Sequence, residues 1–326
     1  MQEPANQAQK RSLVMVAGSG RSGTSLFSGI IKRLGYHVPQ PEVPADQTNP
    51  KGFAEPQWVV DFHDRLLRQA GVQTSDARPA AWARTAQVCV DAAVRDELRT
   101  WLGGQFETSD DLLIKDPRLS WFIPLWRQCA DDLDCRVAFV TMLRHPGAVI
   151  DSKQRYYGGW QGEVARAAGW VGMSLFTERA TRESPRAFVK YDDLLDDWTT
   201  VVSHVGDSLP LPIVQNAQPA QMREVHEFVD RGLVRSRPDW GEATIPDRLR
   251  GQADETWELL SQLSSGGGDT TAIGARLDEV RDEYVQLYAE SEAIVQSSIV
   301  MAHKKAPRPR SVPQAPALRA ARRRPS

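Results

Sequence analysis

Residues 13–25 read Leu13-Val-Met-Val-Ala-Gly-Ser-Gly-Arg-Ser-Gly-Thr-Ser25, and this stretch determines the architecture we expect. Its first five residues are apolar and end at a glycine, which is typical of a buried parallel strand. After the glycine-rich turn, apolar side chains recur at helical spacing from Leu26 to Leu34. Gly35 follows at the position where a helix C-terminus favours glycine. The stretch therefore predicts a strand, a phosphate-type loop and a helix.

The same alternation continues along the chain. Three further apolar runs predict strands: Leu112–Ile114, Val137–Leu143 and Ala187–Val189. Helical stretches are expected between them, near 84–102, 119–131 and 147–182. Strands that alternate with helices form a parallel sheet with helices on both faces. We therefore expect an α/β fold, followed from about Leu194 by a helical C-terminal region.

The glycine-rich loop fits two known templates only in part. As a nucleoside-triphosphatase loop it has Gly18 and Gly23, but Thr24 stands where the lysine is required. As a dinucleotide fingerprint it has the glycines, and Glu42 lies near the distance of the ribose-binding acid. Glu42, however, lies in a proline-rich stretch that is unsuited to a strand end. A Rossmann-type NAD(P)-binding oxidoreductase stays open as the alternative enzyme.

A third interpretation keeps a phosphate-binding site at the helix N-terminus, but its positive charge comes from an arginine instead of the missing lysine. Backbone N–H groups from Gly20 to Ser25 would surround an oxyanion, and Arg21 would supply a positive charge inside the loop. Hydroxyl groups on either side of Gly23 would act as further hydrogen-bond donors to the anion; they belong to Ser22, Thr24 and Ser25. The loop thus predicts a site for a phosphate-like group.

A second anion element follows the expected strand 137–143. Arg144 leaves that strand at its carboxyl end, Pro146 can open a helix, and Ser152 lies about two turns into it. Arg144 and Ser152 can therefore meet one phosphate.

Together these elements resemble the sulfotransferase family, which has a P-loop-NTPase-like three-layer fold. The loop resembles its 5′-phosphosulfate loop, and Arg144 with Ser152 resembles its 3′-phosphate element. Lys115-Asp-Pro-Arg118, Val189-Lys-Tyr-Asp-Asp-Leu194 and Asn49-Pro-Lys-Gly-Phe-Ala-Glu55 are similar to segments of bacterial members. The resemblance implies sulfonate transfer from 3′-phosphoadenosine 5′-phosphosulfate, without a metal, to a hydroxyl acceptor, which could be a small molecule, a glycan or a glycolipid.

The chemistry that this resemblance implies assigns further residues. Arg21 and Lys115 are the candidate cations for the charge that builds up on the leaving oxygen. The acceptor hydroxyl needs a general base, for which Glu55 is the first candidate, His63 the second and Glu42 the third. The aromatic stretch from Tyr156 to Trp160 could present ring faces to an acceptor, although core packing explains it equally well.

Composition and charge bound the remaining possibilities. The segment 303–326 holds eight basic and no acidic residues, which leaves 32 Lys+Arg against 42 Asp+Glu in the rest of the chain. An acidic body argues against a general nucleic-acid binder. The three cysteines show neither disulfide nor zinc-site spacing. Without a signal peptide or a membrane-length apolar run, we expect a cytoplasmic protein.

We expect four regions: a disordered N-terminus (1–12), a sulfotransferase domain (13–263), a C-terminal helix (270–302) and a basic disordered tail (303–326), with a glycine-rich linker before the helix. Apolar residues within 273–300 follow heptad spacing, so this helix could pack on its own domain or form a homodimer. A non-catalytic nucleotide-binding partner protein is the alternative outside enzymes.

Overall fold

The computed structural model describes residues 11–158, 161–209, 211–230, 232, 239–266 and 270–305. The expected disordered N-terminus up to residue 10, the tail from residue 306 and residues 159–160 of the aromatic stretch lie outside the described residues. So do residues 267–269 of the expected linker. The chain divides into two units, Met1–Leu287 and Tyr288–Ser326.

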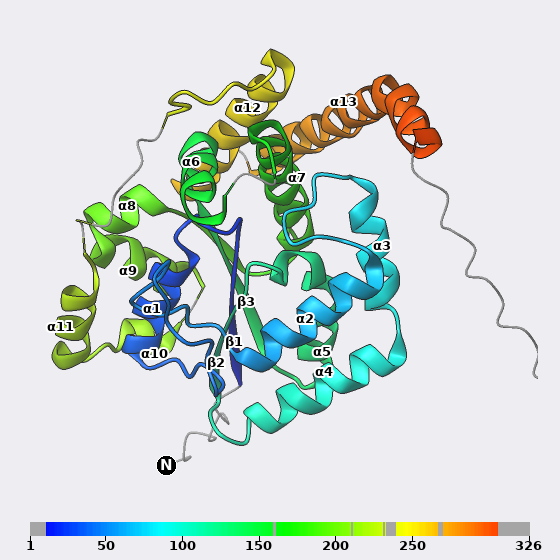
Figure 1. Ribbon diagram of the computed structural model, residues 1–326. Helices are drawn as coiled ribbons and strands as arrows, with labels where there is room; N and C mark the ends of the chain where they lie inside the picture. Colours follow the sequence, from blue (N-terminus) through cyan, green and yellow to red (C-terminus); the bar gives the residue numbers. More distant parts are fainter. Residues whose placement is uncertain are drawn as a thin grey trace, which may run out of the picture. The chain divides into compact units, whose positions relative to one another are not determined.

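A four-stranded parallel sheet forms the centre of the first unit (Figure 1). Its order is β2-β1-β3-β4, and its strands are β1 (Ser12–Ala17), β2 (Asp111–Lys115), β3 (Arg136–Leu143) and β4 (Arg186–Lys190). Val16 of β1 is paired with Lys115 on one side and with Val140 on the other. All four predicted strands are present, and their carboxyl ends meet at one edge of the sheet.

The segment after the first helix distinguishes this sheet from a Rossmann sheet. The His37 N–H donates to the Asp111 carbonyl at 2.9 Å, and the His37 carbonyl accepts from the Leu113 N–H at 2.8 Å. His37 thus pairs with the outer side of β2. In a Rossmann order, the strand that follows the first helix pairs with the first strand itself. Here β2 takes that place, so the sheet order does not favour the oxidoreductase alternative.

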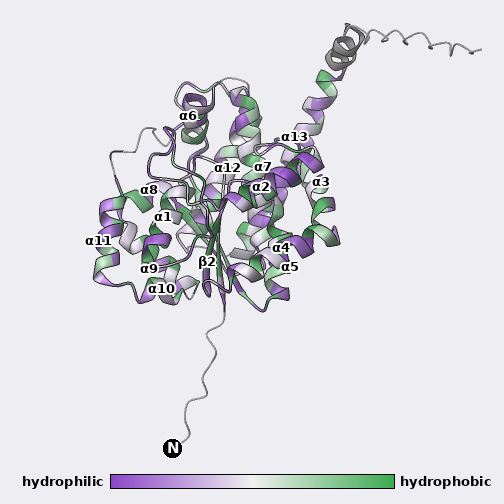
Figure 2. Cartoon of the chain, turned by 60° about the horizontal axis from the view of Figure 1, so that its bottom comes forward, coloured by the Kyte–Doolittle hydropathy of each residue, from purple (hydrophilic) through white to green (hydrophobic). Residues whose placement is uncertain are grey.

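Helices cover both faces of the sheet, as predicted. Leu13 and Met15 of β1 pack on one face against α2 (Gln57–Ala70), α3 (Ala80–Cys89), α4 (Ala92–Gln105), the 3₁₀ helix η1 (Leu119–Phe122) and α5 (Ile123–Asp132). Val14 and Val16 pack on the opposite face against α1 (Thr24–Leu34), α8 (Tyr191–Asp196), α9 (Trp198–Ser208), α10 (Pro212–Gln215) and α11 (Pro219–Phe228). This alternation along one strand confirms the three-layer α/β architecture. Figure 2 shows β2 and its neighbours as hydrophobic, with polar stretches on the surrounding helices.

Two of the expected helical stretches are each divided in two. Stretch 84–102 is interrupted after Cys89, because Asp91 caps a new helix by accepting from the Ala93 N–H. Stretch 147–182 forms α6 (Pro146–Tyr157) and α7 (Glu163–Thr181), with Gly158 at positive φ after the first of them.

A third core cluster joins α6 and α7 to α12 (Asp247–Ser264) and to the beginning of α13 (Thr270–Lys305). Leu277, Val280 and Tyr284 of the heptad pattern are buried here, and the Tyr284 hydroxyl donates to the Ala168 carbonyl at 2.9 Å. These seam positions are therefore occupied by contacts within the chain. A homodimer through 273–300 stays a prediction.

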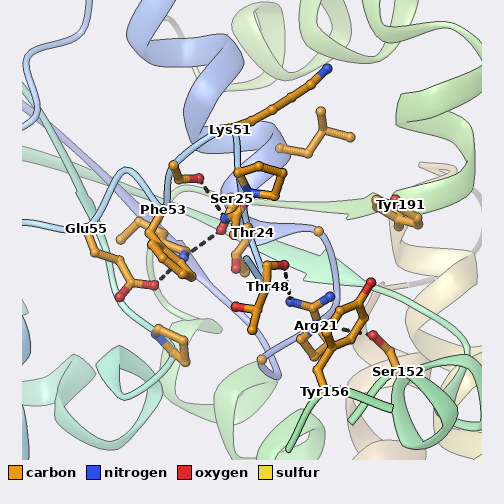
Figure 3. A pocket seen from close by; sticks show the side chains of 18 of the residues that line it. Arg21, Thr24, Ser25, Thr48, Lys51, Phe53, Glu55, Ser152, Tyr156 and Tyr191 are labelled. Carbon is orange, nitrogen blue, oxygen red and sulfur yellow. Dashed lines mark hydrogen bonds and ion pairs between the residues drawn. The ribbon is translucent and has the colours of Figure 1, made fainter. Parts of the chain in front are cut away.

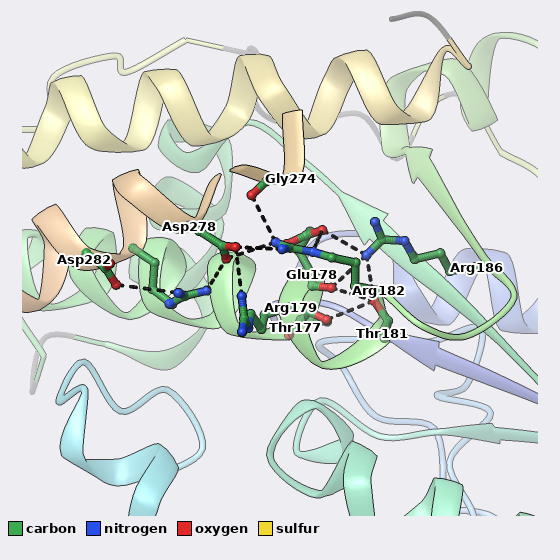
Figure 4. Close-up of polar contacts among 10 residues, drawn as sticks. Thr177, Glu178, Arg179, Thr181, Arg182, Arg186, Gly274, Asp278 and Asp282 are labelled. Carbon is green, nitrogen blue, oxygen red and sulfur yellow. Dashed lines mark hydrogen bonds and ion pairs between the residues drawn. The ribbon is translucent and has the colours of Figure 1, made fainter. Parts of the chain in front are cut away.

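An ion-pair network fastens the start of α13 to α7 (Figure 4). The Arg182 guanidinium binds Glu178 at 2.6 Å and Asp278 at 2.8 Å, and Arg186 binds Glu178 at 3.0 Å. Glu178 is fully buried, so its charge is neutralised by two arginines. Within the described ranges, no helix has the length and apolar character that crossing a bilayer requires.

Candidate functional site

The glycine-rich loop lies at the carboxyl end of β1 and has a backbone that glycine makes possible. Gly18 and Gly23 have φ angles of 128° and 93°. A Cβ on Gly18 would lie 2.7 Å from the Met142 carbonyl, and one on Gly23 would lie 2.3 Å from the Tyr191 ring. Arg21 also adopts a positive φ, of 75°, although it carries a side chain. Such a conformation costs about 1 kcal/mol, and it is concentrated at functional sites.

The loop leads directly into α1, and no side chain caps the N–H groups at the N-terminus of this helix. Gly23 precedes the helix and provides no side-chain cap, and the first turn holds no acidic residue. The first N–H groups of a helix have no intrahelical acceptor and attract negative charge. Thr24 and Ser25 begin the helix and line the adjoining pocket. This arrangement fits a phosphate-like ligand.

The Ser22 hydroxyl is not part of this pocket. It is buried and donates to the Ser19 carbonyl at 2.5 Å, and the Ser22 N–H donates to the same carbonyl at 3.1 Å. Ser22 therefore shapes the loop from within rather than offering a hydroxyl donor to a ligand. Gly20, Arg21, Gly23, Thr24 and Ser25 line the pocket, and their role in binding a nucleotide stays a prediction.

The Arg21 side chain lies across the pocket toward α6 (Figure 3). Its Nε donates to Ser152 Oγ at 3.0 Å, and one terminal nitrogen donates to the Thr48 carbonyl at 3.4 Å. The guanidinium also lies 4.4 Å from the centre of the Tyr156 ring. The structure thus places the cation of the loop beside the serine of the second predicted anion element.

Arg144 enters the same pocket from the end of β3. Its terminal nitrogen donates to the Arg21 carbonyl at 3.0 Å, and its guanidinium lies 4.5 Å from the Tyr191 ring centre. Arg144 is 8% exposed, and burial lowers the pKa of its guanidinium. In the described part of the chain, neither Arg21 nor Arg144 forms an ion pair with a carboxylate. The pocket therefore contains two guanidinium groups that could bind a negatively charged ligand.

A buried ion pair of Glu55 and Lys115 lines the pocket, and Figure 3 shows Glu55 on the side away from Ser152. The Lys115 ammonium, at the end of β2, donates to Glu55 and, at 3.0 Å, to Ser25 Oγ. Glu55 is 7% exposed and Lys115 is 2% exposed. Burial raises the pKa of the Glu55 carboxyl, and the positive charge of Lys115 opposes that shift without cancelling it. A carboxylate with a raised pKa is a stronger base, so Glu55 has the environment of a proton acceptor.

His63 is not in the pocket. It lies on the buried face of α2, where its Nδ1 is 2.7 Å from an Asp116 oxygen and its Nε2 accepts from the Trp126 indole N–H at 2.9 Å. Because Nε2 accepts, Nδ1 carries the proton and donates to Asp116. Burial alone would raise the pKa of Asp116, but the bond from His63 helps to hold it below its ordinary value. His63 is therefore a core residue rather than a candidate base.

Glu42 also lies away from the pocket. Its carboxylate binds the Lys32 ammonium at 2.5 Å and accepts from the Gln40 amide at 2.7 Å. Both contacts are on the surface side of α1, so Glu42 has neither the position of a general base nor that of a ribose-binding acid.

Several lining residues were not predicted from the sequence. Lys51 and Phe53 lie on the pocket wall between Thr48 and Glu55, and Phe228 reaches it from the end of α11. The Lys51 ammonium donates to the Phe228 carbonyl at 2.6 Å, which joins the two wall segments. Lys51 and Phe53 belong to the quoted Asn49–Glu55 segment and could have been found there. Phe228 had no local signal.

Comparisons with known proteins add a similarity to a solved structure. No protein-family model matches the chain, and no curated protein matches it. Among solved structures, the chain is similar to the sulfotransferase domain of the olefin synthase from Synechococcus PCC 7002. The identity is 17%, the TM-score is 0.46, and the match covers 80% of this chain and 98% of that one. A likeness at this level does not by itself identify a family or an activity.

Proposed function

We propose that this chain is a sulfotransferase that transfers a sulfonate group from 3′-phosphoadenosine 5′-phosphosulfate to a hydroxyl acceptor. One observation carries the proposal: the loop of Arg21 and the pair Arg144–Ser152 line the same pocket. A nucleotide with phosphate groups at both the 5′ and the 3′ position needs two anion sites within one cavity. ATP and NAD have no 3′-phosphate for the second site.

The residues present fit such a nucleotide. The N-terminus of α1 and Arg21 would hold the 5′-phosphosulfate, and Arg144 with Ser152 would hold the 3′-phosphate. The Arg21 guanidinium now donates to the Ser152 hydroxyl, and both groups could turn to a phosphate placed between them. The absence of carboxylate partners for Arg21 and Arg144, among the residues described, means that no ion pair must first be broken.

Sulfonate transfer is an in-line displacement in which charge builds up on the oxygen that bridges sulfur and phosphorus. Lys115 contacts Ser25 at the first turn of α1, and its ammonium would neutralise that charge. Glu55, on the other side of Lys115, would take the proton from the acceptor hydroxyl. Once the ammonium turns to the leaving oxygen, its pull on the carboxylate weakens, and Glu55 becomes the stronger base.

The acceptor would enter beside the aromatic wall. Phe53, Tyr156, Tyr157 and Phe228 line the pocket, and Tyr157 is 53% exposed. Ring faces of this kind bind flat apolar surfaces, including the faces of sugars and of aromatic rings. The proposed acceptor is therefore a hydroxyl compound that carries a ring, either a glycan or a small aromatic molecule.

Calorimetry with adenosine 3′,5′-bisphosphate, adenosine 5′-phosphate, ATP and NAD tests the nucleotide. The first should bind most tightly. Arg144→Ala should weaken it about tenfold to a hundredfold, because a hydrogen bond to a charged group contributes about 1.5–3 kcal/mol. The affinity of the Arg144→Ala variant for adenosine 5′-phosphate should hardly change. Arg65→Ala removes an exposed arginine of α2 that pairs with Glu97, and serves as the control. Equal losses for both adenosine nucleotides would exclude the 3′-phosphate role of Arg144.

A further inference from the structure

A buried lysine lies directly behind the anion loop. Lys153 follows Ser152 on α6 but is not in the pocket; it is 7% exposed. Its ammonium donates to Ser19 Oγ in the loop and to Ser75 Oγ between α2 and α3, both at 3.2 Å. Two successive residues of α6 therefore contact the loop from different sides. Ser152 contacts Arg21 in the pocket, and Lys153 contacts Ser19 in the interior.

In the part of the chain that the structure describes, no carboxylate pairs with Lys153. On α7, Arg166 is a further cation, held by the Gln154 side chain and the Gly158 carbonyl. The acidic groups on the neighbouring elements have other partners: Asp76 binds Arg78, Asp151 binds Arg155, and Asp254 of α12 accepts from the Trp240 indole. Among the described residues, Lys153 thus has two hydroxyl partners and no carboxylate.

An ammonium in this position is costly. Burial and, as a smaller contribution, the positive charge of Arg166 together lower the pKa of Lys153 to about 8. A negative group bound in the loop would act in the opposite direction, because it would lie in the same poorly solvated region and attract the ammonium. An anion in the loop would supply the counter-charge that Lys153 lacks among the described residues.

We propose that Lys153 is a buried cation of the anion site, and that binding of an anion in the loop is coupled to uptake of one proton by Lys153. The proton passes from the solvent to the neutral Nζ, which becomes an ammonium; no other bond forms or breaks. Lys153 touches the loop through Ser19 and not the ligand, so it is a positioning residue. The proposal rests on the proposed function in that the anion is the 5′-group of the nucleotide.

Calorimetry of adenosine 3′,5′-bisphosphate at pH 8.5, in two buffers of different ionisation enthalpy, measures this coupling. The phosphate groups are fully ionised at that pH, since their second pKa is about 6. For the wild-type protein, the observed enthalpy should depend on the buffer, with net proton uptake. The affinity should fall about tenfold between pH 7 and pH 9.5, because the proton must be supplied from an ever more basic solvent.

Lys153→Met should bind more weakly at pH 7, with no proton uptake and a flat pH profile. Lys32→Met, on the exposed face of α1, is the control and should behave as the wild type does. Binding by the wild type without proton uptake, or uptake that persists in Lys153→Met, would overturn this inference and leave the nucleotide site intact. A wild-type protein that binds no adenosine 3′,5′-bisphosphate would overturn both proposals. Should Lys153→Met not fold, the buffer dependence of the wild type alone decides.

Discussion

Replacing Lys153 with methionine should change how the stability of the protein depends on pH. Burial lowers the pKa of Lys153 from 10.5 to about 8. One pKa unit corresponds to about 1.4 kcal/mol, so keeping this side chain charged in the folded protein costs about 3 kcal/mol at pH 7. Methionine has a similar length and no charge, and it removes that cost. The substitution also removes two hydrogen bonds, to Ser19 and Ser75, that stabilise by about 1 kcal/mol each.

The sign of the pH dependence follows from the two pKa values. Below pH 8, Lys153 is protonated in both the folded and the unfolded chain, and the full cost is present. Between pH 8 and 10.5, the folded protein has lost a proton that the unfolded chain still holds, so the free energy of unfolding rises with pH. At pH 9.5 the cost has fallen by about 2 kcal/mol. Lys153→Met should thus be about 1 kcal/mol more stable than the wild type at pH 7 and about 1 kcal/mol less stable at pH 9.5.

Urea unfolding of both proteins at pH 7, 8, 9 and 9.5, followed by tryptophan fluorescence and by circular dichroism, measures this difference. Comparing the variant with the wild type removes the effects of all other groups that titrate in this range. Lys32→Met is the control for the loss of a lysine at the surface, and the change of sign is expected only for the Lys153 variant. A difference in unfolding free energy that stays constant from pH 7 to 9.5 would refute the account of Lys153 as a costly buried cation.

Four further predictions concern the pocket and its supports. Glu55→Gln should bind adenosine 3′,5′-bisphosphate normally and transfer sulfonate at least about a hundredfold more slowly, because the amide cannot take a proton; transfer of radiolabelled sulfonate to candidate ring-bearing alcohols measures this. Gly23→Ala should weaken nucleotide binding at least about tenfold in calorimetry, since its Cβ would meet the Tyr191 ring. His63→Leu should lose about 3 kcal/mol of unfolding free energy in urea, because Asp116 and the Trp126 indole lose their buried partner, while the folded protein keeps its nucleotide affinity. Glu178→Gln should lower the free energy of unfolding, measured in urea, by about 3 kcal/mol, because two arginines lose a buried counter-charge.

The sheet could be predicted from the sequence because its strands are short apolar runs with sharp boundaries. Leu13–Ala17 is apolar at every position, as expected for a strand covered on both faces. The carboxyl ends of parallel strands share one edge, which is why Arg144 could be placed near the loop of Arg21 before any coordinates were known. The boundary between α3 and α4 was missed, because a two-residue break with a capping Asp91 hardly disturbs the helical periodicity.

The candidate site was predictable where a residue type is tied to a local motif. Glu55 and Lys115 follow such motifs, and the structure pairs them. His63 shows the limit: its position along α2 is compatible with a pocket residue, but only the packing of α2 on α5 shows that its ring faces Trp126 and Asp116. Lys153 gives no signal at all in one sequence. Its importance comes from burial and from two hydroxyl partners, Ser19 and Ser75, that lie far from it along the chain.

The structure of the protein in complex with adenosine 3′,5′-bisphosphate is the most direct test of the proposed site. The account predicts the 5′-phosphate at the N-terminus of α1, against the N–H groups of Thr24 and Ser25. The 3′-phosphate should lie between the Arg144 guanidinium and the Ser152 hydroxyl. A nucleotide whose two phosphate groups leave Arg144 without contact, or which binds outside the pocket of Arg21, would contradict the proposed sulfotransferase site.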